Sequence, residues 1–147
     1  MSKQVQAEYD FTKQIGFLLR RAYQRHVEIF QRAVPESRLT AAQFVVLLTA
    51  RDHGPCEIPF FQAATSIDEA SLRGIVERLK WRKLLDTENE VGDARRMVVT
   101  LTPDGQTLLD QTVPFAQQIT EDTYGDLSAS ERATLVALLH KMSATGA

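Results

Sequence analysis

The stretch that decides the fold is SIDEASLRGIVERLKWRKLLDTENEVGDARRMVVTLTPDG, residues 66–105. Its first half opens with Ser66 and Glu69 at the spacing of a capping box and continues at helical spacing to about Lys83. Its second half is rich in β-favouring residues and ends with Thr-Pro-Asp-Gly, a typical helix start. We therefore expect a capped helix, then a β-hairpin whose turn is the segment 89–96, then another helix.

The helix in this stretch has two different faces. Four apolar residues lie within about 100° of one another and form the inward stripe: Leu72, Ile75, Val76 and Leu79. The outward face carries Ala70, Gly74, Glu77, Arg78 and Trp81, flanked by Ser71 and Arg73. A mid-helix glycine costs about 1 kcal/mol relative to alanine. Gly74 therefore suggests a face that a bulky partner approaches closely, although a solvated face has the same composition.

The hairpin carries Arg95 and Arg96 behind Asp93, in a chain with a formal net charge of -2. Arginine is favoured in a narrow minor groove, where negative potential is concentrated, and Asp93 can hold one of the two guanidinium groups. Intraloop ion pairs are common on any surface. Directly behind a capped helix with small outward residues, however, the pair favours a winged helix-turn-helix, with the helix in the major groove and the hairpin along the backbone.

The predicted DNA-binding residues come from both parts of this motif. Ser71 can bond a phosphate or a base edge, and Arg73 can pair with guanine or with a phosphate. The full set is Ser71, Arg73, Gly74, Arg78, Asp93, Arg95 and Arg96.

The rest of the chain predicts helices. One long helix covers about Tyr9–Val34 and ends at Pro35, with an apolar stripe that includes His26. Another begins at a Thr40–Gln43 capping box and ends at Gly54, and a short helix follows around Pro59. A long helix after Thr102, with a possible bend at Pro114, and a last one from a Ser128–Glu131 capping box complete the chain. The fold class is mostly α with a small β-hairpin wing.

The composition fits one globular domain. The chain has 147 residues, of which 44% are hydrophobic and 24% charged. No run approaches the roughly 18 apolar residues of a membrane span, and the polar N-terminus lacks a signal-peptide core. The single cysteine, Cys56, excludes an internal disulfide and fits a reducing compartment. We expect a cytoplasmic protein.

Four segments together resemble the MarR family of bacterial transcription regulators: LTAAQFVVLL, IDEASLRGIVERLKWRKLL, GDARRMVVTLTPDGQTLL and LSASERATLVALLHKM. The resemblance covers about Tyr9–Met142. It is most specific at Asp-x-Arg (Asp93, Arg95) and Leu-Thr-Pro-x-Gly (residues 101–105). Ser71 and Arg73 match recognition-helix positions, and Arg95 matches the wing arginine. Two positions depart from the family pattern: Lys83 replaces a glycine, and Phe61-Gln62 replaces a leucine-alanine pattern.

The resemblance implies an architecture and a mode of action. It implies one MarR-like domain over residues 1–147, with dimerisation helices at about 9–35 and 103–147 and a winged helix at about 39–101. It further implies an obligate homodimer that binds a palindromic operator in double-stranded DNA, associates with the nucleoid when bound, and is released by a small ligand.

The first predicted helix resembles that of members that govern aromatic-compound catabolism. There an arginine meets the carboxylate of an aromatic acid, and guanidinium pairs well with carboxylate. The candidates here are Arg20 and Arg21 for the carboxylate, with Phe44 as an aromatic wall and His26 as a further contact. His26 can equally be a core histidine, and the effector can be a free acid or a coenzyme A thioester. The leading interpretation is a repressor, with activation of target genes left open.

Other functions fit the sequence less well. His53, Cys56 and Glu57 contain half of a zinc site, which would make a metal-responsive regulator, and Cys56 could sense oxidants. A winged helix can also serve only as a protein-interaction module, but this use needs no arginines on the wing. An enzyme is not expected, because the sequence has no nucleophile–base pair, no complete metal site and no phosphate-binding glycine loop. No metal and no cofactor is predicted.

Overall fold

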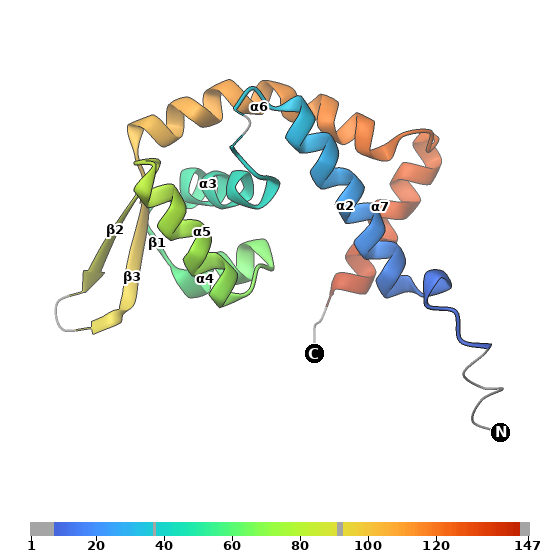
Figure 1. Ribbon diagram of the computed structural model, residues 1–147, viewed down its shortest axis with the longest axis horizontal. Helices are drawn as coiled ribbons and strands as arrows, with labels where there is room; N and C mark the ends of the chain where they lie inside the picture. Colours follow the sequence, from blue (N-terminus) through green and yellow to red (C-terminus); the bar gives the residue numbers. More distant parts are fainter. Residues whose placement is uncertain (1–7, 37, 91–92, 145–147) are drawn as a thin grey trace.

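The structure is a computed structural model that describes residues 8–36, 38–90 and 93–144, without the side chains of Glu90, Ala94 and Arg95. Its elements, in chain order, are η1 Phe11–Lys13, α2 Ile15–Ala33, α3 Ala41–His53, β1 Cys56–Glu57, α4 Ile58–Thr65, α5 Glu69–Trp81, β2 Leu85–Glu90, β3 Asp93–Leu101, α6 Pro103–Tyr124 and α7 Ala129–Ser143. The predicted fold class, mostly helical with a small β wing, is confirmed (Figure 1). None of the helices among the described residues has the length and apolar character to cross a membrane.

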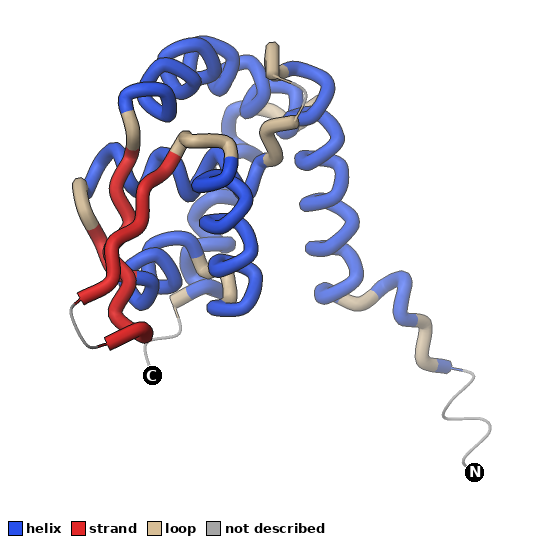
Figure 2. The backbone as a smooth tube through the Cα atoms, turned by 60° about the vertical axis from the view of Figure 1, so that its left-hand side comes forward, coloured by secondary structure: helices blue, strands red, loops and turns tan. Residues whose placement is uncertain are grey.

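The hydrophobic core lies between α3, α4, α5, the sheet and the first half of α6. Phe61, Leu72, Leu79, Leu85 and Val99 are fully buried within it. The three strands are antiparallel in the order β1-β3-β2, and Figure 2 shows the sheet along one side of the helices. These elements form the winged-helix part of the chain.

The long helix α6 connects this part to the two ends of the chain. In Figure 1 the wing hangs from the N-terminal end of α6, and α2 and α7 lie at the opposite end. The helix continues through Pro114 from residue 103 to residue 124. Its start is fixed by Thr102, whose hydroxyl accepts from the Gly105 N–H at 3.0 Å. At Gly105 a Cβ atom would lie 2.3 Å from the carbonyl oxygen of Leu84, so the close approach of α6 to that backbone requires glycine.

Two of the three predicted capping boxes are confirmed, at Thr40–Gln43 and Ser128–Glu131. The box predicted at Ser66–Glu69 is wrong. Ser66 has a left-handed backbone (φ 59°) that ends α4, so it lies too early to cap the next helix. Asp68 caps α5 instead and accepts from the Ser71 N–H at 2.8 Å.

The first helix begins later than predicted. Asp10 caps the short 3₁₀ helix η1, and Gln14 then takes an extended conformation (φ -86°, ψ 146°). The α-helix proper therefore starts at Ile15 rather than at Tyr9. Its end at Ala33, just before Pro35, agrees with the prediction.

The turn after α5 has the left-handed backbone conformation that glycine favours, although the residue there is Lys83. Lys83 has φ 63°, in the left-handed region. The backbone N–H of Lys83 donates to Lys80 O at 2.8 Å, and that of Leu84 donates to Leu79 O at 2.9 Å, which closes the helix. The departure at Lys83 therefore leaves the turn in place, at a conformational cost of about 1 kcal/mol for a side chain that carries a Cβ atom.

The hairpin strands extend further than predicted. β2 continues to Glu90 and β3 begins at Asp93, so most of the predicted turn, residues 89–96, is strand. The register passes from Asn89 opposite Met97 to Glu90 opposite Asp93, so residues 94–96 bulge out of the ladder. The two arginines thus lie on a bulge behind the tip. The third strand, β1, was not predicted, because two residues are too few to show an alternating pattern.

Candidate nucleic-acid interface

The outward face of α5 is built by the burial of its opposite face. Leu72, Val76 and Leu79 are buried and Ile75 is half-buried, as predicted. Ala70, Ser71, Gly74, Glu77, Arg78 and Trp81 are all exposed. Apart from its chain neighbours and the nearby backbone of α5, no atom lies within 4 Å of the position that a Cβ atom at Gly74 would occupy. The fold itself therefore does not require glycine there.

The first turn of α5 holds its polar side chains in hydrogen bonds. The Ser71 hydroxyl donates to Asp68 Oδ2 at 2.8 Å. The Ser71 backbone N–H and then this hydroxyl hold the pKa of the Asp68 carboxyl below its usual value. Arg73 donates from Nη2 and Nε to Glu69 Oε1 at 3.0 Å and 3.1 Å. The side chain of Arg78 has no hydrogen-bond or ion-pair partner among the described residues.

The wing carries the second group of predicted DNA-binding residues. Arg96 is exposed and donates to Glu57 Oε1 from Nη2 at 3.0 Å and from Nε at 3.3 Å. This ion pair ties the bulge of β3 to β1, whose Glu57 lies opposite Val98 in the ladder. Asp93 is half-buried at the start of β3. The side chain of Arg95 lies outside the described residues, although its backbone belongs to β3.

Arg73 and Arg96, two of the predicted DNA-binding cations, are each held by a carboxylate of the same chain. Exposed ion pairs of this kind contribute up to about 1 kcal/mol, so they can open when a phosphate competes for the arginine. The hydrogen-bond partners Asp68, Glu69 and Glu57 were not predicted. The spacing of Glu69 and Arg73 on one helix could have indicated their pair, whereas Glu57 and Arg96 are 39 residues apart.

The predicted effector residues lie around α2 and α3. Phe44 is buried, and its ring lies 5.4 Å from that of Phe30, one helical turn after His26. His26 is half-buried, and its Nδ1 lies 2.9 Å from Thr123 Oγ1 of α6. Burial lowers the pKa of His26. The structure therefore gathers His26 and Phe44 on the side of α2 that faces the rest of the chain.

The structure does not bring Arg20 and Arg21 to that side. Both are exposed, and Arg21 lies over the Phe17 ring at 6.0 Å. On a regular helix each is more than about 100° away from His26 around the axis. The arginine that does contact α6 is Arg25, which donates to the backbone carbonyl of Thr123 and, at 2.8 Å, to that of Asp122. Nothing local in the sequence pointed to Arg25 or Thr123, because these partners are 98 residues apart.

The half zinc site is not assembled among the described residues, where no group of three or more histidine, cysteine or carboxylate side chains could hold a metal ion. The His53 ring packs edge-on against Phe60 at 4.9 Å. The Cys56 thiol donates to Gly54 O at 3.1 Å, and Glu57 is paired with Arg96. Burial also raises the pKa of the Cys56 thiol, whereas a redox-sensing thiol needs a lowered pKa.

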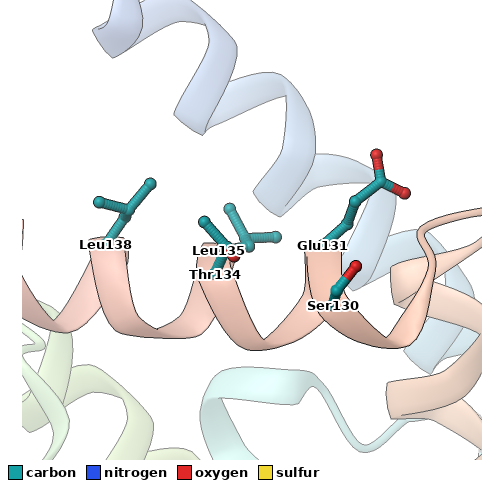
Figure 3. A pocket seen from close by; sticks show the side chains of 5 residues that line it. All are labelled: Ser130, Glu131, Thr134, Leu135 and Leu138. Atoms are coloured by element: carbon teal, nitrogen blue, oxygen red, sulfur yellow. The ribbon is translucent and has the colours of Figure 1, made fainter.

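Apolar side chains are exposed at both ends of the chain. No residue of α7 is buried. Figure 3 shows Leu135 and Leu138 projecting from one side of α7 beside Glu131, where they line an open hollow of about 310 Å³. The large exposed apolar residues of these ends are Tyr9, Phe11, Ile15, Leu18, Leu19, Tyr23, Val113, Phe115, Leu135, Val136, Leu138, Leu139 and Met142. Exposed apolar side chains in this number indicate an interaction site.

Relatives and solved structures resemble the chain over most of its length, although no family model matches it. The HTH-type transcriptional repressor NicR of Pseudomonas putida is 48% identical over 134 residues, which cover 91% of this chain and 85% of NicR. A structure of BpsR from Bordetella bronchiseptica, whose DNA binding is regulated by 6-hydroxynicotinic acid, matches with a TM-score of 0.85 and 55% identity, covering 92% and 97% of the two chains. A MarR structure from E. coli with operator DNA matches with a TM-score of 0.79 and 26% identity, covering 92% and 99%.

Proposed function

Because the chain belongs to the MarR family of transcription regulators, we propose that it is a dimeric repressor that leaves its operator when it binds a small aromatic acid. The observation that carries this proposal is the similarity to NicR and BpsR over nearly the whole chain, including α5 and the wing. The effector class is transferred from BpsR, whose DNA binding responds to 6-hydroxynicotinic acid.

In the proposed DNA complex, the outward face of α5 enters the major groove and the wing follows the adjacent minor groove. Ser71, Arg73 and Arg78 contact phosphates or base edges, and Gly74 lets the DNA approach the helix backbone. On the wing, Arg95 and Arg96 reach the minor groove while Asp93 orients one of them. The exposure of the α5 face and of Arg96 supports these roles.

The exposed apolar faces of α2, α6 and α7 support a homodimer, because burying them requires a second chain. We assign residues 9–35 and 103–147 to dimerisation and residues 39–101 to the winged helix. A two-fold axis then places the two α5 helices on a palindromic operator with half-sites about one DNA turn apart. DNA binding thus depends on the spacing that the dimer imposes.

The effector acts by preferring the dimer conformation in which that spacing is wrong. It lowers operator affinity by its differential affinity for the two conformations. His26 and Phe44 line the proposed site on one chain, while Arg20 and Arg21 supply a cation for the carboxylate. Since neither arginine shares the His26 side of α2, the site is completed when the helices of two chains pack together. The chain acts in the cytoplasm by binding alone and catalyses no reaction.

The test is an anisotropy titration of the chain against labelled DNA from its own promoter region, with and without 6-hydroxynicotinate. We expect salt-dependent binding that 6-hydroxynicotinate reverses. Arg73→Ala and Arg78→Ala should weaken binding to promoter DNA, each by at least about tenfold if it removes a base contact. Arg51→Ala is the matched control, because Arg51 pairs with Asp52 outside this surface. Equal loss in all three variants would contradict the assignment of α5, and binding unaffected by the acid would contradict the effector.

A further inference from the structure

Two neighbouring residues of helix α2, Arg25 and His26, contact the C-terminal end of α6. The Arg25 guanidinium donates to the carbonyls of Asp122 and Thr123, which lie in the last turn of α6 where carbonyl groups lack helical partners. The next residue, His26, places Nδ1 2.9 Å from the Thr123 hydroxyl oxygen. At Gly125, just beyond this turn, a Cβ atom would lie 3.2 Å from Arg25 Nη2. The hydrogen bonds of Arg25 to this turn of α6 therefore help to hold the neighbouring His26 ring against Thr123.

The Thr123 hydroxyl determines which ring nitrogen of His26 carries the proton. A hydroxyl has one hydrogen to donate and lone pairs to accept with. Thr123 donates that hydrogen to Ile119 O at 2.7 Å. Both hydrogen bonds of the hydroxyl can exist together only if Nδ1 of His26 is the donor. The hydrogen bond made by one ring nitrogen then fixes the state of the other.

The second nitrogen, Nε2, is left as an acceptor. Burial lowers the pKa of His26, so the ring is neutral at neutral pH and has one proton, on Nδ1. Nε2 then presents a lone pair, for which the described residues provide no hydrogen-bond partner. A half-buried acceptor without a partner is unfavourable unless a water or a ligand donates to it.

We propose that Thr123 is a positioning residue that holds His26 with its proton on Nδ1, so that Nε2 accepts a hydrogen bond from a hydroxyl or ring N–H of the effector. This inference rests on the proposed function and narrows it. The effector is then an aromatic acid with a hydrogen-bond donor on its ring, rather than any aromatic carboxylate. Nicotinate and 6-hydroxynicotinate form a matched pair of probes, because both carry the ring and the carboxylate and only the second carries a donor.

The first measurement is the long-range proton–nitrogen correlation spectrum of the isotope-labelled chain at neutral pH. It distinguishes a protonated from an unprotonated ring nitrogen, and His26→Gln assigns the signals among His26, His53 and His140. We expect Nδ1 protonated and Nε2 unprotonated in the wild type and in Thr123→Ser, which keeps the hydroxyl. In Thr123→Val, which keeps the shape and loses the acceptor, the proton should redistribute to Nε2. A purely structural role of Thr123 would leave the tautomer unchanged.

The second measurement is calorimetric titration of both acids. The wild type and Thr123→Ser should bind 6-hydroxynicotinate about tenfold more tightly than nicotinate, which is the fold-change of one hydrogen bond. Thr123→Val should lose most of that difference while its affinity for nicotinate remains. Equal affinity for the two acids in the wild type, or a proton on Nε2, would overturn the inference and leave the proposed function standing. A wild type that binds its promoter DNA but neither acid would overturn both the effector assignment and the role of Nε2.

Discussion

A larger residue at position 74 should be tolerated by the fold but not by the proposed DNA contact. Gly74 lies in the middle of α5, and apart from its chain neighbours and the nearby helix backbone no atom lies within 4 Å of where its Cβ would be. Gly74→Ala should therefore raise the free energy of unfolding by about 1 kcal/mol, because alanine is the better helix former. The same change should weaken operator binding, since the added methyl group keeps the DNA away from the helix. Chemical denaturation and anisotropy titration measure the two effects, and unchanged operator affinity would contradict the close approach.

Lys83 occupies a backbone conformation that suits glycine. With φ 63° it bears a cost that a residue without Cβ avoids. Lys83→Gly should therefore stabilise the chain by about 1 kcal/mol. Lys80→Gly, in the helix three residues earlier, should destabilise it by about the same amount. Thermal denaturation of both variants checks the sign, and a destabilised Lys83→Gly would show that the lysine side chain has a stabilising contact.

His26 gives the chain a predictable response to acid. Its pKa in the folded state is lowered by burial, so the unfolded chain binds a proton more readily. The contribution of neutral His26 to stability is complete at neutral pH and is lost as the pH falls through its ordinary value of 6.5 toward the lowered one. When the pH is lowered from neutral to mildly acidic, the denaturation midpoint should fall further for the wild type than for His26→Gln. An equal fall in both would assign the acid sensitivity to other groups.

Among the elements, α5 and the wing each pair an arginine that we propose to contact DNA with a carboxylate of the chain. Glu69→Gln should remove the ion pair of Glu69 with Arg73, and Glu57→Gln should remove the ion pair of Glu57 with Arg96. Each change should raise DNA affinity by up to about fivefold, since an exposed pair contributes at most about 1 kcal/mol. Each change should also make the binding constant fall more steeply with salt. The slope of its logarithm against the logarithm of the salt concentration should become more negative by about 0.9 per added phosphate contact. Asp52→Asn, which frees Arg51 elsewhere, is the control, and lower affinity in Glu69→Gln would mean that Glu69 orients Arg73.

For the whole molecule, a charged substitution on the exposed apolar side of α7 tests the proposed dimer. Leu135→Asp should convert the chain to monomers in analytical ultracentrifugation and abolish tight operator binding, because a charge in a buried apolar interface is costly. Ala137→Asp places the same charge on the opposite side of the same helix, where Ala137 is exposed. It should remain dimeric. Monomers in both variants, or dimers in both, would contradict the assignment of this face.

The sequence predicted the elements whose signals are local. The capping boxes at Thr40 and Ser128, the inward stripe of α5 and the start of α6 at Thr102 each depend on residues within a few positions. The box at Ser66 failed because two competing caps, Ser66 and Asp68, lie two residues apart and only the end of α4 decides between them. The family, confirmed by the relatives, followed from the recognition helix and the wing motif together.

The long-range contacts that form the proposed sites could not be predicted from the sequence. β1 is too short to show a pattern, and its pairing with β3 joins residues about 40 positions apart. The joint of Arg25 and His26 with Thr123 depends on how α2 crosses the end of α6, which no local spacing encodes. Arg20 and Arg21 were predicted from a family resemblance of the first helix and from the affinity of guanidinium for carboxylate. A helix alone does not reveal which of its arginines contacts a distant element.

Because no residue of α7 is buried within one chain, the stability of this helix should depend on the concentration of the protein in the cell. An isolated helix of 15 residues is marginal in water, so α7 gains most of its stability from the surface that covers it. If that surface belongs to a second copy, folding of this end is a second-order process whose yield follows mass action. Scarce, newly made chains then expose a frayed terminus to proteases, while abundant chains protect one another. The abundance of the regulator would rise more steeply than its rate of synthesis.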